Sequence, residues 1–188
     1  MRQTQHTLIV ITGPIASGKS TVARALYHEL AGPDARAAVI DLDILEDMLT
    51  ADGPKSDLVS WTLARRASAR LANGFLADGV AVVIADGSYN LASDRATLEQ
   101  HLDTGVSPLY VTLKVTFEEA LRRARRDPTR GISRDPAFLA GYFAAAAKAS
   151  RDLPTSDIVI DTESVAPTAA AAEIARIART GHVGVRLG

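Results

Sequence analysis

The stretch TLIVITGPIASGKSTVARALYHEL, residues 7–30, decides the fold of this chain. It opens with an apolar, β-branched run that favours a buried strand, and it closes with a segment of helical character. Between the two, GPIASGKS at residues 13–20 has the spacing Gly, four residues, Gly, Lys, Ser that is typical of a phosphate-binding loop. A strand before this motif and a helix after it are the context that the motif requires. The sequence therefore predicts a phosphate loop at residues 13–20.

Each position of this phosphate loop has a physical role. Gly13 and Gly18 allow the backbone to turn sharply and approach phosphate closely, so that successive N–H groups point inward at a helix N-terminus. Lys19 supplies a mobile positive charge for the β- and γ-phosphates, and Ser20 offers a hydroxyl ligand to Mg²⁺. We expect ATP with Mg²⁺ here, although the loop alone does not separate ATP from GTP. The residues expected to hold the nucleotide are Gly13, Ala16, Ser17, Gly18, Lys19, Ser20 and Thr21.

Length and composition limit the remaining possibilities. The 188 residues fit one domain, because two halves would each approach the lower size limit for an independent core. With a formal net charge of -1, the chain has no global positive field, and we expect neither nucleic-acid nor membrane binding. It has no cysteine, which excludes disulfides and thiolate chemistry. The N-terminal apolar run is too short for a signal peptide, so we expect a cytoplasmic protein.

Short apolar runs alternate with longer helical segments along the whole chain, which is typical of a parallel sheet with crossover helices. The expected strands lie at residues 7–12, 37–41, 80–86, 109–115 and 157–161. The expected helices lie at residues 18–31, 42–51, 57–78, 93–103, 117–126, 136–151 and 167–179. This pattern predicts an α/β fold with a single domain over residues 1–188.

Two missing motifs narrow the class of phosphate-loop protein. A GTP switch would carry an Asn-Lys-x-Asp guanine motif, which this sequence lacks. Transport and AAA-type ATPases usually end a later strand in Asp-Glu, whereas VVIAD here ends in Asp86 followed by Gly87. Both observations argue against a nucleotide switch or a hydrolysis-driven motor.

Two carboxylates, Asp41 and Asp43, follow the second expected strand. In open α/β sheets, ligands bind at the carboxyl ends of the strands. An ionised carboxylate at this place can orient and deprotonate an alcohol that attacks the γ-phosphate. The alternative is that one of the two merely caps the helix that follows, because Asp is a favoured N-cap residue.

With this Asp-x-Asp behind the phosphate loop, the chain resembles the phosphate-loop small-molecule kinases, such as shikimate kinase and chloramphenicol phosphotransferase. The resemblance implies a three-layer α/β sandwich whose five parallel strands follow the order 2-3-1-4-5. It also implies that Asp43 accepts the proton of the attacking hydroxyl and contacts the substrate. Asp41 would hold Mg²⁺ through water.

The arginine-rich stretch FEEALRRARRDPTRGISRDP, residues 117–136, matches the place of a mobile lid in these kinases. Helix-breaking residues in its second half predict a short lid near residues 126–136. By resemblance, Arg123 would lie against adenine, and the arginines expected to reach the phosphates are Arg126, Arg130 and Arg134, with Arg130 acting in catalysis. The alternative is a solvated basic surface.

The third expected strand ends in DGSYN, residues 86–90, at the same edge of the sheet. Asp86 is expected near Mg²⁺ through Ser20, while Ser88 and Tyr89 are expected to contact the substrate. Arg66 is a candidate for binding acidic groups of the substrate. The alternative for DGSYN is an ordinary turn followed by a helix cap.

Together these features favour an ATP-dependent phosphotransferase that acts on a hydroxyl group of a small metabolite or antibiotic. Two alternatives stay open. One is a nucleotide, nucleoside or adenylylsulfate kinase, and the other is a regulatory module that uses the phosphate loop as a sensor. The sequence carries no code for the acceptor and no signal of oligomeric state.

Overall fold

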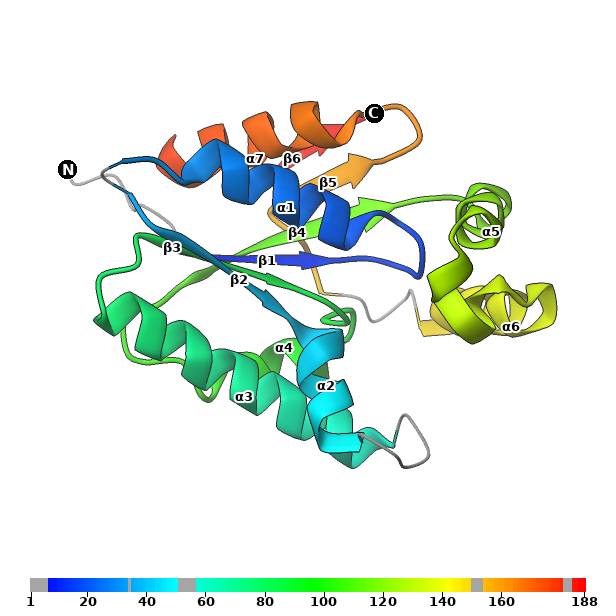
Figure 1. Cartoon of the computed structure of the whole chain (residues 1–188), viewed down its shortest axis with the longest axis horizontal. Helices are drawn as coiled ribbons and strands as arrows, with labels where there is room; N and C mark the ends of the chain where they lie inside the picture. Colours follow the sequence, from blue (N-terminus) through cyan, green and yellow to red (C-terminus); the bar gives the residue numbers. More distant parts are fainter. Residues whose placement is uncertain (1–6, 34, 51–56, 150–153, 181–183) are drawn as a thin grey trace.

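One parallel sheet forms the centre of the computed structural model, which describes residues 7–188 except 34, 51–56, 150–153 and 181–183 (Figure 1). Its strands lie in the order β2-β3-β1-β4-β5-β6, and all neighbouring pairs are parallel. Their bounds are Leu8–Thr12 (β1), Ala37–Asp41 (β2), Val82–Asp86 (β3), Pro108–Lys114 (β4), Ile158–Asp161 (β5) and Val185–Leu187 (β6). The expected order of five strands is confirmed. The sixth strand was missed because three residues are too few to show an alternation of polar and apolar side chains.

The helices begin and end close to the predicted bounds. They are α1 Lys19–Leu30, α2 Leu42–Thr50, α3 Leu58–Ala77, α4 Ala92–Glu99, α5 Phe117–Arg126, α6 Pro136–Ala149 and α7 Pro167–Thr180, with a 3₁₀ helix, η1, at Pro128–Arg134. One helix, expected at 93–103, ends early at Glu99. The side chain of Asn73 accepts a hydrogen bond from the backbone N–H of Asp103 and donates one to the carbonyl of His101, which holds this stretch as a turn.

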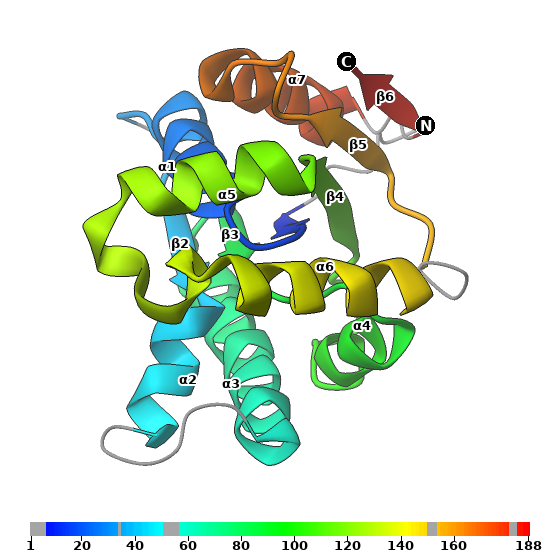
Figure 2. The same cartoon turned by 90° about the vertical axis from the view of Figure 1, so that its right-hand side faces the viewer.

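The helices form two layers on the sheet and a third group beyond its edge. Helices α1 and α7 cover one face, and α3 and α4 cover the other (Figure 1). Helices α5 and α6 lie beyond the carboxyl ends of the strands, across the end of the sheet (Figure 2). The sequence-distant segments that follow β1, β2, β3 and β4 therefore meet at one edge.

Alternation along β1 divides the core between the two faces. Ile9 and Ile11 point to the side of α1 and α7, whereas Leu8 and Val10 point to the side of α3 and α4, and all four are fully buried. Strand β1 is hydrogen-bonded on both sides, to β3 and β4. This central position explains its uninterrupted apolar sequence.

A smaller apolar cluster joins the third group to the phosphate loop. Its buried members are Ala16 of the loop, Ala120 and Ala124 of α5 and Leu139 of α6. The rings of Phe117 and Phe143 meet edge to face beside it, at 5.8 Å between centroids. Helices α5 and α6 are therefore packed directly on the loop.

Within the described part of the chain, no helix combines the length and the apolar character that a bilayer crossing needs.

The turn after β3 gives a stability prediction. A Cβ atom at Gly87 would lie 2.4 Å from Cβ of Leu42, and φ at this residue is +153°. Gly87→Ala should lower the free energy of unfolding by about 1–3 kcal/mol, because the buried Leu42 cannot move away freely. Gly74→Ala, in the open interior of α3, is the matched control and should raise it by up to about 1 kcal/mol. Urea unfolding measures both, and equal stability of the two variants would contradict the packing described here.

Candidate functional site

The phosphate loop, residues 13–20, connects β1 to α1 in a tight turn. A Cβ atom at Gly13 would lie 2.6 Å from the carbonyl oxygen of Leu113, so only glycine fits between the loop and β4. Helix α1 begins at Lys19 without a side-chain cap, which leaves its first N–H groups facing the loop. Among the described residues, the buried hydroxyl of Ser17 has no hydrogen-bond partner. These unpaired donors fit the oxygens of a phosphate chain.

The ammonium group of Lys19 is hydrogen-bonded to the backbone of the phosphate loop. Its Nζ donates to the carbonyl oxygens of Gly13 and Pro14, each at 3.1 Å. Burial lowers the pKa of this ammonium, and the negative charges of Asp43 and Asp86 oppose that shift. A bound phosphate would supply the negative charge that the desolvated ammonium lacks.

Ser20 and Asp86 form the expected pair at the end of β3. The Ser20 hydroxyl donates to Oδ2 of Asp86 at 2.8 Å. Asp86 is almost fully buried, and burial raises the pKa of its carboxyl to about 6, although the bond from Ser20 opposes the shift. Asp41 lies beside Asp86 in register on the neighbouring strand β2. A hydroxyl and two carboxylates are hard oxygen donors of the kind that Mg²⁺ prefers, so these residues fit the ion.

Asp41 also caps the helix that follows it, which was the alternative to a functional role. Its Oδ1 accepts hydrogen bonds from the backbone N–H of Asp43 at 2.9 Å and of Ile44 at 3.4 Å, and it therefore caps α2. Because Asp41 is the cap, the Asp43 side chain does not cap α2. Asp41 remains a candidate for Mg²⁺ only through water or its second oxygen.

Asp43 faces a pocket of about 150 Å³ that also contains Lys19, Ser20 and Arg130. Part of the residue is open to solvent, yet the surrounding protein desolvates the carboxyl enough to raise its pKa above the usual value. Lys19 opposes this shift, and the nearby carboxylate of Asp41 adds to it. The pocket thus joins a carboxylate of raised pKa to the two cations expected at the phosphates.

A second pocket, of about 300 Å³, lies on the other side of the loop and is lined by Ser17, Arg123, Thr162 and Pro167 among others. The guanidinium of Arg123 is held by Glu119 at 2.6 Å and donates to the carbonyl oxygen of Thr162 at 2.8 Å. The guanidinium is therefore fixed at the wall of this pocket. The role of Arg123 beside a nucleotide base stays a prediction.

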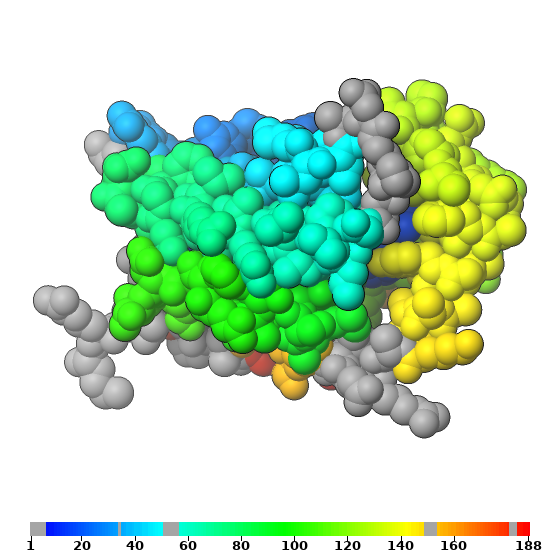
Figure 3. All heavy atoms as spheres, turned by 90° about the horizontal axis from the view of Figure 1, so that it is seen from below, coloured from blue at the N-terminus to red at the C-terminus, as the bar shows by residue number. Residues whose placement is uncertain are grey.

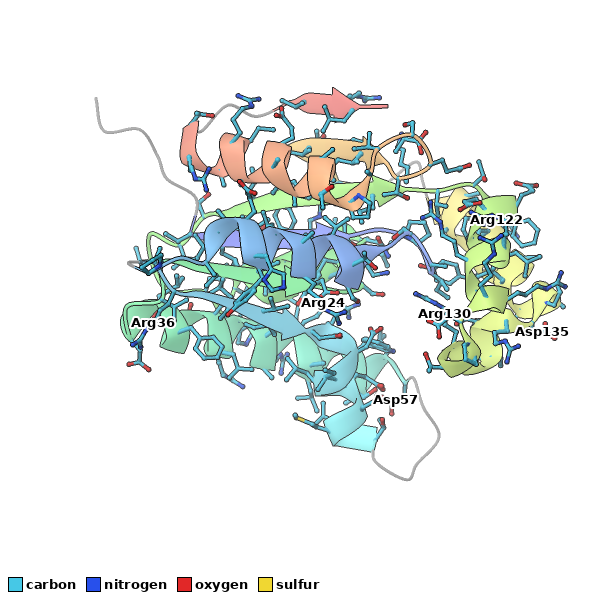
Figure 4. All side chains as sticks on the ribbon, turned by 45° about the horizontal axis from the view of Figure 1, so that its top comes forward. Arg24, Arg36, Asp57, Arg122, Arg130 and Asp135 are labelled. Atoms are coloured by element: carbon cyan, nitrogen blue, oxygen red, sulfur yellow. The ribbon has the colours of Figure 1, made fainter. Side chains whose placement is uncertain are left out.

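The arginines of the lid segment, residues 126–136, separate into two groups. Arg130 lines both pockets, and Nε of its guanidinium pairs with Oδ2 of Asp127 at 3.2 Å. Figure 4 shows Arg130 on the inner side of the lid, turned toward the phosphate loop, whereas Arg122 lies farther out on α5. Arg126 and Arg134 are exposed and line neither pocket. The structure thus brings one of the three expected lid arginines to the pockets beside the phosphate loop.

The DGSYN loop differs from the expectation of a substrate-binding surface. Tyr89 is fully buried in the core under α3, where its hydroxyl donates to Ser68 at 2.9 Å, so its side chain serves packing rather than substrate contact. Ser88 offers its carbonyl oxygen to Arg65, at 2.8 Å from Nη2. Arg66 lies exposed on α3 and does not line the pocket of Asp43.

Sequence reasoning missed Tyr142 of α6, which reaches the phosphate loop. Burial raises the pKa of its hydroxyl, and interactions with the backbone of Ile15 and the side chain of Asn90 oppose this shift. The sequence signal was faint, because Tyr142 stands in an alanine-rich helix that reads as a packing element. A hydroxyl-bearing aromatic residue on an otherwise mostly apolar helix was the hint that the sequence offered.

Comparison with known proteins agrees with this geometry. A family model described as AAA domain matches residues 8–137, which include the phosphate loop, Asp43 and the lid segment. No curated protein matches the chain significantly.

Several solved structures share the fold over nearly the whole chain. APS kinase of Mycobacterium tuberculosis in complex with AMPPNP and APS has a TM-score of 0.66 at 22% identity, and the match covers 92% of this chain and 97% of that one. Shikimate kinase from Acinetobacter baumannii with shikimate has a TM-score of 0.56 at 20% identity and covers 93% of both chains. The Deinococcus radiodurans tunicamycin resistance protein has a TM-score of 0.62 at 22% identity and covers 91% of this chain and 94% of that one.

The raised pKa of Asp86 gives a prediction with opposite effects on stability and binding. Because its pKa in the folded protein is about 6, above that of an unfolded chain, stability falls as the pH rises from about 4 to 6. Asp86→Asn should therefore be more stable than the wild type by about 1–3 kcal/mol at pH 8 and not at pH 4. The same change should weaken Mg²⁺-dependent ATP binding at least tenfold.

Urea unfolding at the two pH values and calorimetric titration with ATP, with and without Mg²⁺, measure these effects. Asp78→Asn, at the exposed C-terminal end of α3, is the control and should change neither. A stability difference that is the same at pH 4 and pH 8 would refute the assignment to Asp86 ionisation.

Proposed function

The chain belongs to the AAA domain family, here a family of phosphate-loop small-molecule kinases, and from this premise we propose that it transfers the γ-phosphoryl group of ATP to a hydroxyl of a small molecule. The observation that carries the proposal is the pocket shared by Lys19, Asp43 and Arg130. A hydrolytic motor does not need a carboxylate at this place. A phosphotransferase needs it to receive the proton of its acceptor.

The roles of the residues follow from their positions. The backbone N–H groups of the phosphate loop and Lys19 bind the β- and γ-phosphates, and Arg130 approaches the same phosphates from the lid. Mg²⁺, when bound at Ser20 and near Asp86, neutralises part of the negative charge on the phosphates. Arg123 and Pro167 line the pocket for the base. We assign the nucleotide as ATP.

Asp43 acts as the general base. The acceptor oxygen forms a bond to the γ-phosphorus while the bond from this phosphorus to the β,γ-bridging oxygen breaks, and the hydroxyl proton passes to Asp43. The products are a phosphate ester and ADP. The raised pKa of Asp43 favours this step, because a carboxylate of higher pKa is the stronger base.

The similar structures indicate which classes of acceptor to test. Similarity to the tunicamycin resistance protein supports an antibiotic as the acceptor. Similarity to shikimate kinase supports a hydroxylated metabolite as the acceptor. The fold shared with APS kinase keeps adenylylsulfate as a second candidate acceptor. Incubation with ATP and a panel of hydroxyl compounds, including chloramphenicol, nucleosides, shikimate and adenylylsulfate, followed by mass spectrometry for a phosphate adduct, tests all of them. Tight ATP binding without any adduct would favour a regulatory module.

Replacing the base tests its role directly. Asp43→Asn should lower kcat for phosphoryl transfer by about 10²–10⁴-fold, because the amide cannot accept the proton, while the Kd for ATP changes less than threefold. Steady-state kinetics and calorimetric titration with ATP measure the two effects. Asp78→Asn serves again as the matched control. Full activity in Asp43→Asn would remove Asp43 from the reaction.

The lid assignment is tested by comparing arginines. Arg130→Met should lower kcat by about 10³-fold, because its guanidinium alone among the three expected lid arginines lines the phosphate pocket. Arg126→Met and Arg134→Met should each cause less than a tenfold loss. The same order of losses, measured with one acceptor under saturating ATP, supports the assignment, and a larger loss for Arg134→Met would reverse it.

A further inference from the structure

A cavity of about 420 Å³ lies over β4, β5 and β6, on the side of the sheet that faces α3 and α4. Figure 2 shows α4 below β4 and away from β5 and β6. Seen from the side of α3 and α4, orange and red atoms of the C-terminal part of the chain reach the surface beside green α4 (Figure 3). None of the described helices therefore covers β5 and β6 on this side.

The register of these three strands brings two exposed cations to the cavity. Thr112, Val159 and Arg186 are partners across β4, β5 and β6, so their side chains face the same side of the sheet. Lys114 follows Thr112 by two residues and faces that side too. Neighbouring strands lie about 4.8 Å apart, so the long side chains of Lys114 and Arg186 can reach one small ligand above Val159. Both line the cavity and both are exposed.

The cavity also contains a buried cation, Arg95 of α4. This residue is 5% exposed, and its guanidinium carbon lies 4.1 Å from the centre of the Tyr110 ring. Its guanidinium donates to the carbonyl oxygens of Tyr89 and Thr155 and to the hydroxyl of Ser156. These three acceptors are neutral, and burial lowers the pKa of the guanidinium. A bound anion would stabilise this buried positive charge.

The acidic groups near Arg95 lie outside the cavity. Asp157 and Glu99 both oppose the shift of the Arg95 pKa. Asp157, however, accepts the backbone N–H of Tyr110 at 2.8 Å, and Glu99 accepts the phenol hydroxyl of the same tyrosine at 2.7 Å. Neither lines the cavity, and among the described residues neither forms an ion pair with Arg95.

The two exposed cations are likewise not matched by an acidic residue of the lining. Asp161 is the register partner of Lys114 on β5, but its Oδ1 accepts the backbone N–H of Glu163 at 2.9 Å, and it does not line the cavity. The two pockets beside the phosphate loop each contain an aspartate beside their cations. The described lining of this cavity, in contrast, has three cations and no acidic residue.

Two hydroxyls add a further hydrogen-bond donor. Thr112 and Ser156 share one hydrogen bond, with 2.6 Å between their oxygens, and both line the cavity. Whichever of the two donates, the other keeps a proton for which the described residues provide no acceptor. Cations together with a free hydroxyl proton are the groups that bind the oxygens of phosphate, sulfate and carboxylate.

We propose that this cavity is a second anion site, which binds a small molecule through a phosphate, sulfate or carboxylate group held by Lys114, Arg186 and Arg95. Anion binding here does not depend on phosphoryl transfer, because the cavity shares no described lining residue with the two pockets beside the phosphate loop.

Titration of the AMPPNP-bound protein tests the site. Saturating AMPPNP and Mg²⁺ occupy the phosphate loop, and inorganic phosphate, sulfate and succinate are then added separately at constant ionic strength while the amide signals of ¹⁵N-labelled protein are followed. At least one of these anions should shift the amides of Thr112 and Ser156 with a Kd of about 5 mM or tighter. The anion that binds most tightly identifies the group. Weaker binding of all three, or shifts confined to residues 13–20, would overturn the site.

Replacement of the exposed cations locates the binding. Lys114→Met and Arg186→Met should each weaken binding of the best anion by about fivefold or more, while the Kd for AMPPNP stays within about twofold. Arg70→Met removes an exposed cation of α3 that lines none of these pockets, so it is the matched control and should leave anion binding unchanged. An equal weakening by Arg70→Met would reduce the effect to general attraction by positive charge and refute the site. Arg95 is kept, because it ties α4 to the residues before β5.

Discussion

The close approach of Gly13 to the carbonyl oxygen of Leu113 is the contact from which the site is built. It sets the end of β1 directly against β4, so the chain must turn there and enter α1 with its first N–H groups uncapped. Because β1 is the central strand, the turn opens at the middle of the carboxyl edge. The ends of β2, β3 and β4 then lie within reach of the same small volume, and each contributes a functional side chain or the segment that carries one.

The charged side chains at the carboxyl edge of the sheet do not fully compensate one another for the loss of solvent. Burial lowers the pKa of Lys19 and raises that of Asp43 and Asp86, so each is held in a setting that disfavours its charged form. Such an arrangement lowers the stability of the ligand-free protein. A triphosphate and its metal ion bring both signs of charge to the groups that lack them, and the binding free energy is therefore concentrated where the reaction takes place.

Local sequence predicted the strands, the helices and the phosphate loop, because each depends on short-range periodicity and on a motif with fixed spacing. It also predicted the pairing of Ser20 with Asp86, which follows from the order of the strands. It did not decide which of Asp41 and Asp43 caps α2. Either residue can act as the cap, and only the backbone geometry assigns this role to Asp41. Tyr89 was misplaced at the pocket because its strand-end position does not reveal that the ring turns inward to Ser68. Tyr142 was missed because its contacts with Ile15 and Asn90 join parts of the chain that are far apart in sequence.

This contrast has a structural basis in the two halves of the site. The nucleotide half is made of the phosphate loop, the start of α1 and α5, which is packed on the loop through Ala16, so its chemistry can be read from contiguous residues. The acceptor half that we propose begins at Asp43 in the first turn of α2, a helix without a motif of its own. Substitutions at exposed positions around Asp43 can change the acceptor without disturbing the loop, because the residues packed on Ala16 lie in α5 and α6. A shared nucleotide half with separately variable acceptor walls is the arrangement expected when one fold serves kinases as different as those for shikimate and APS.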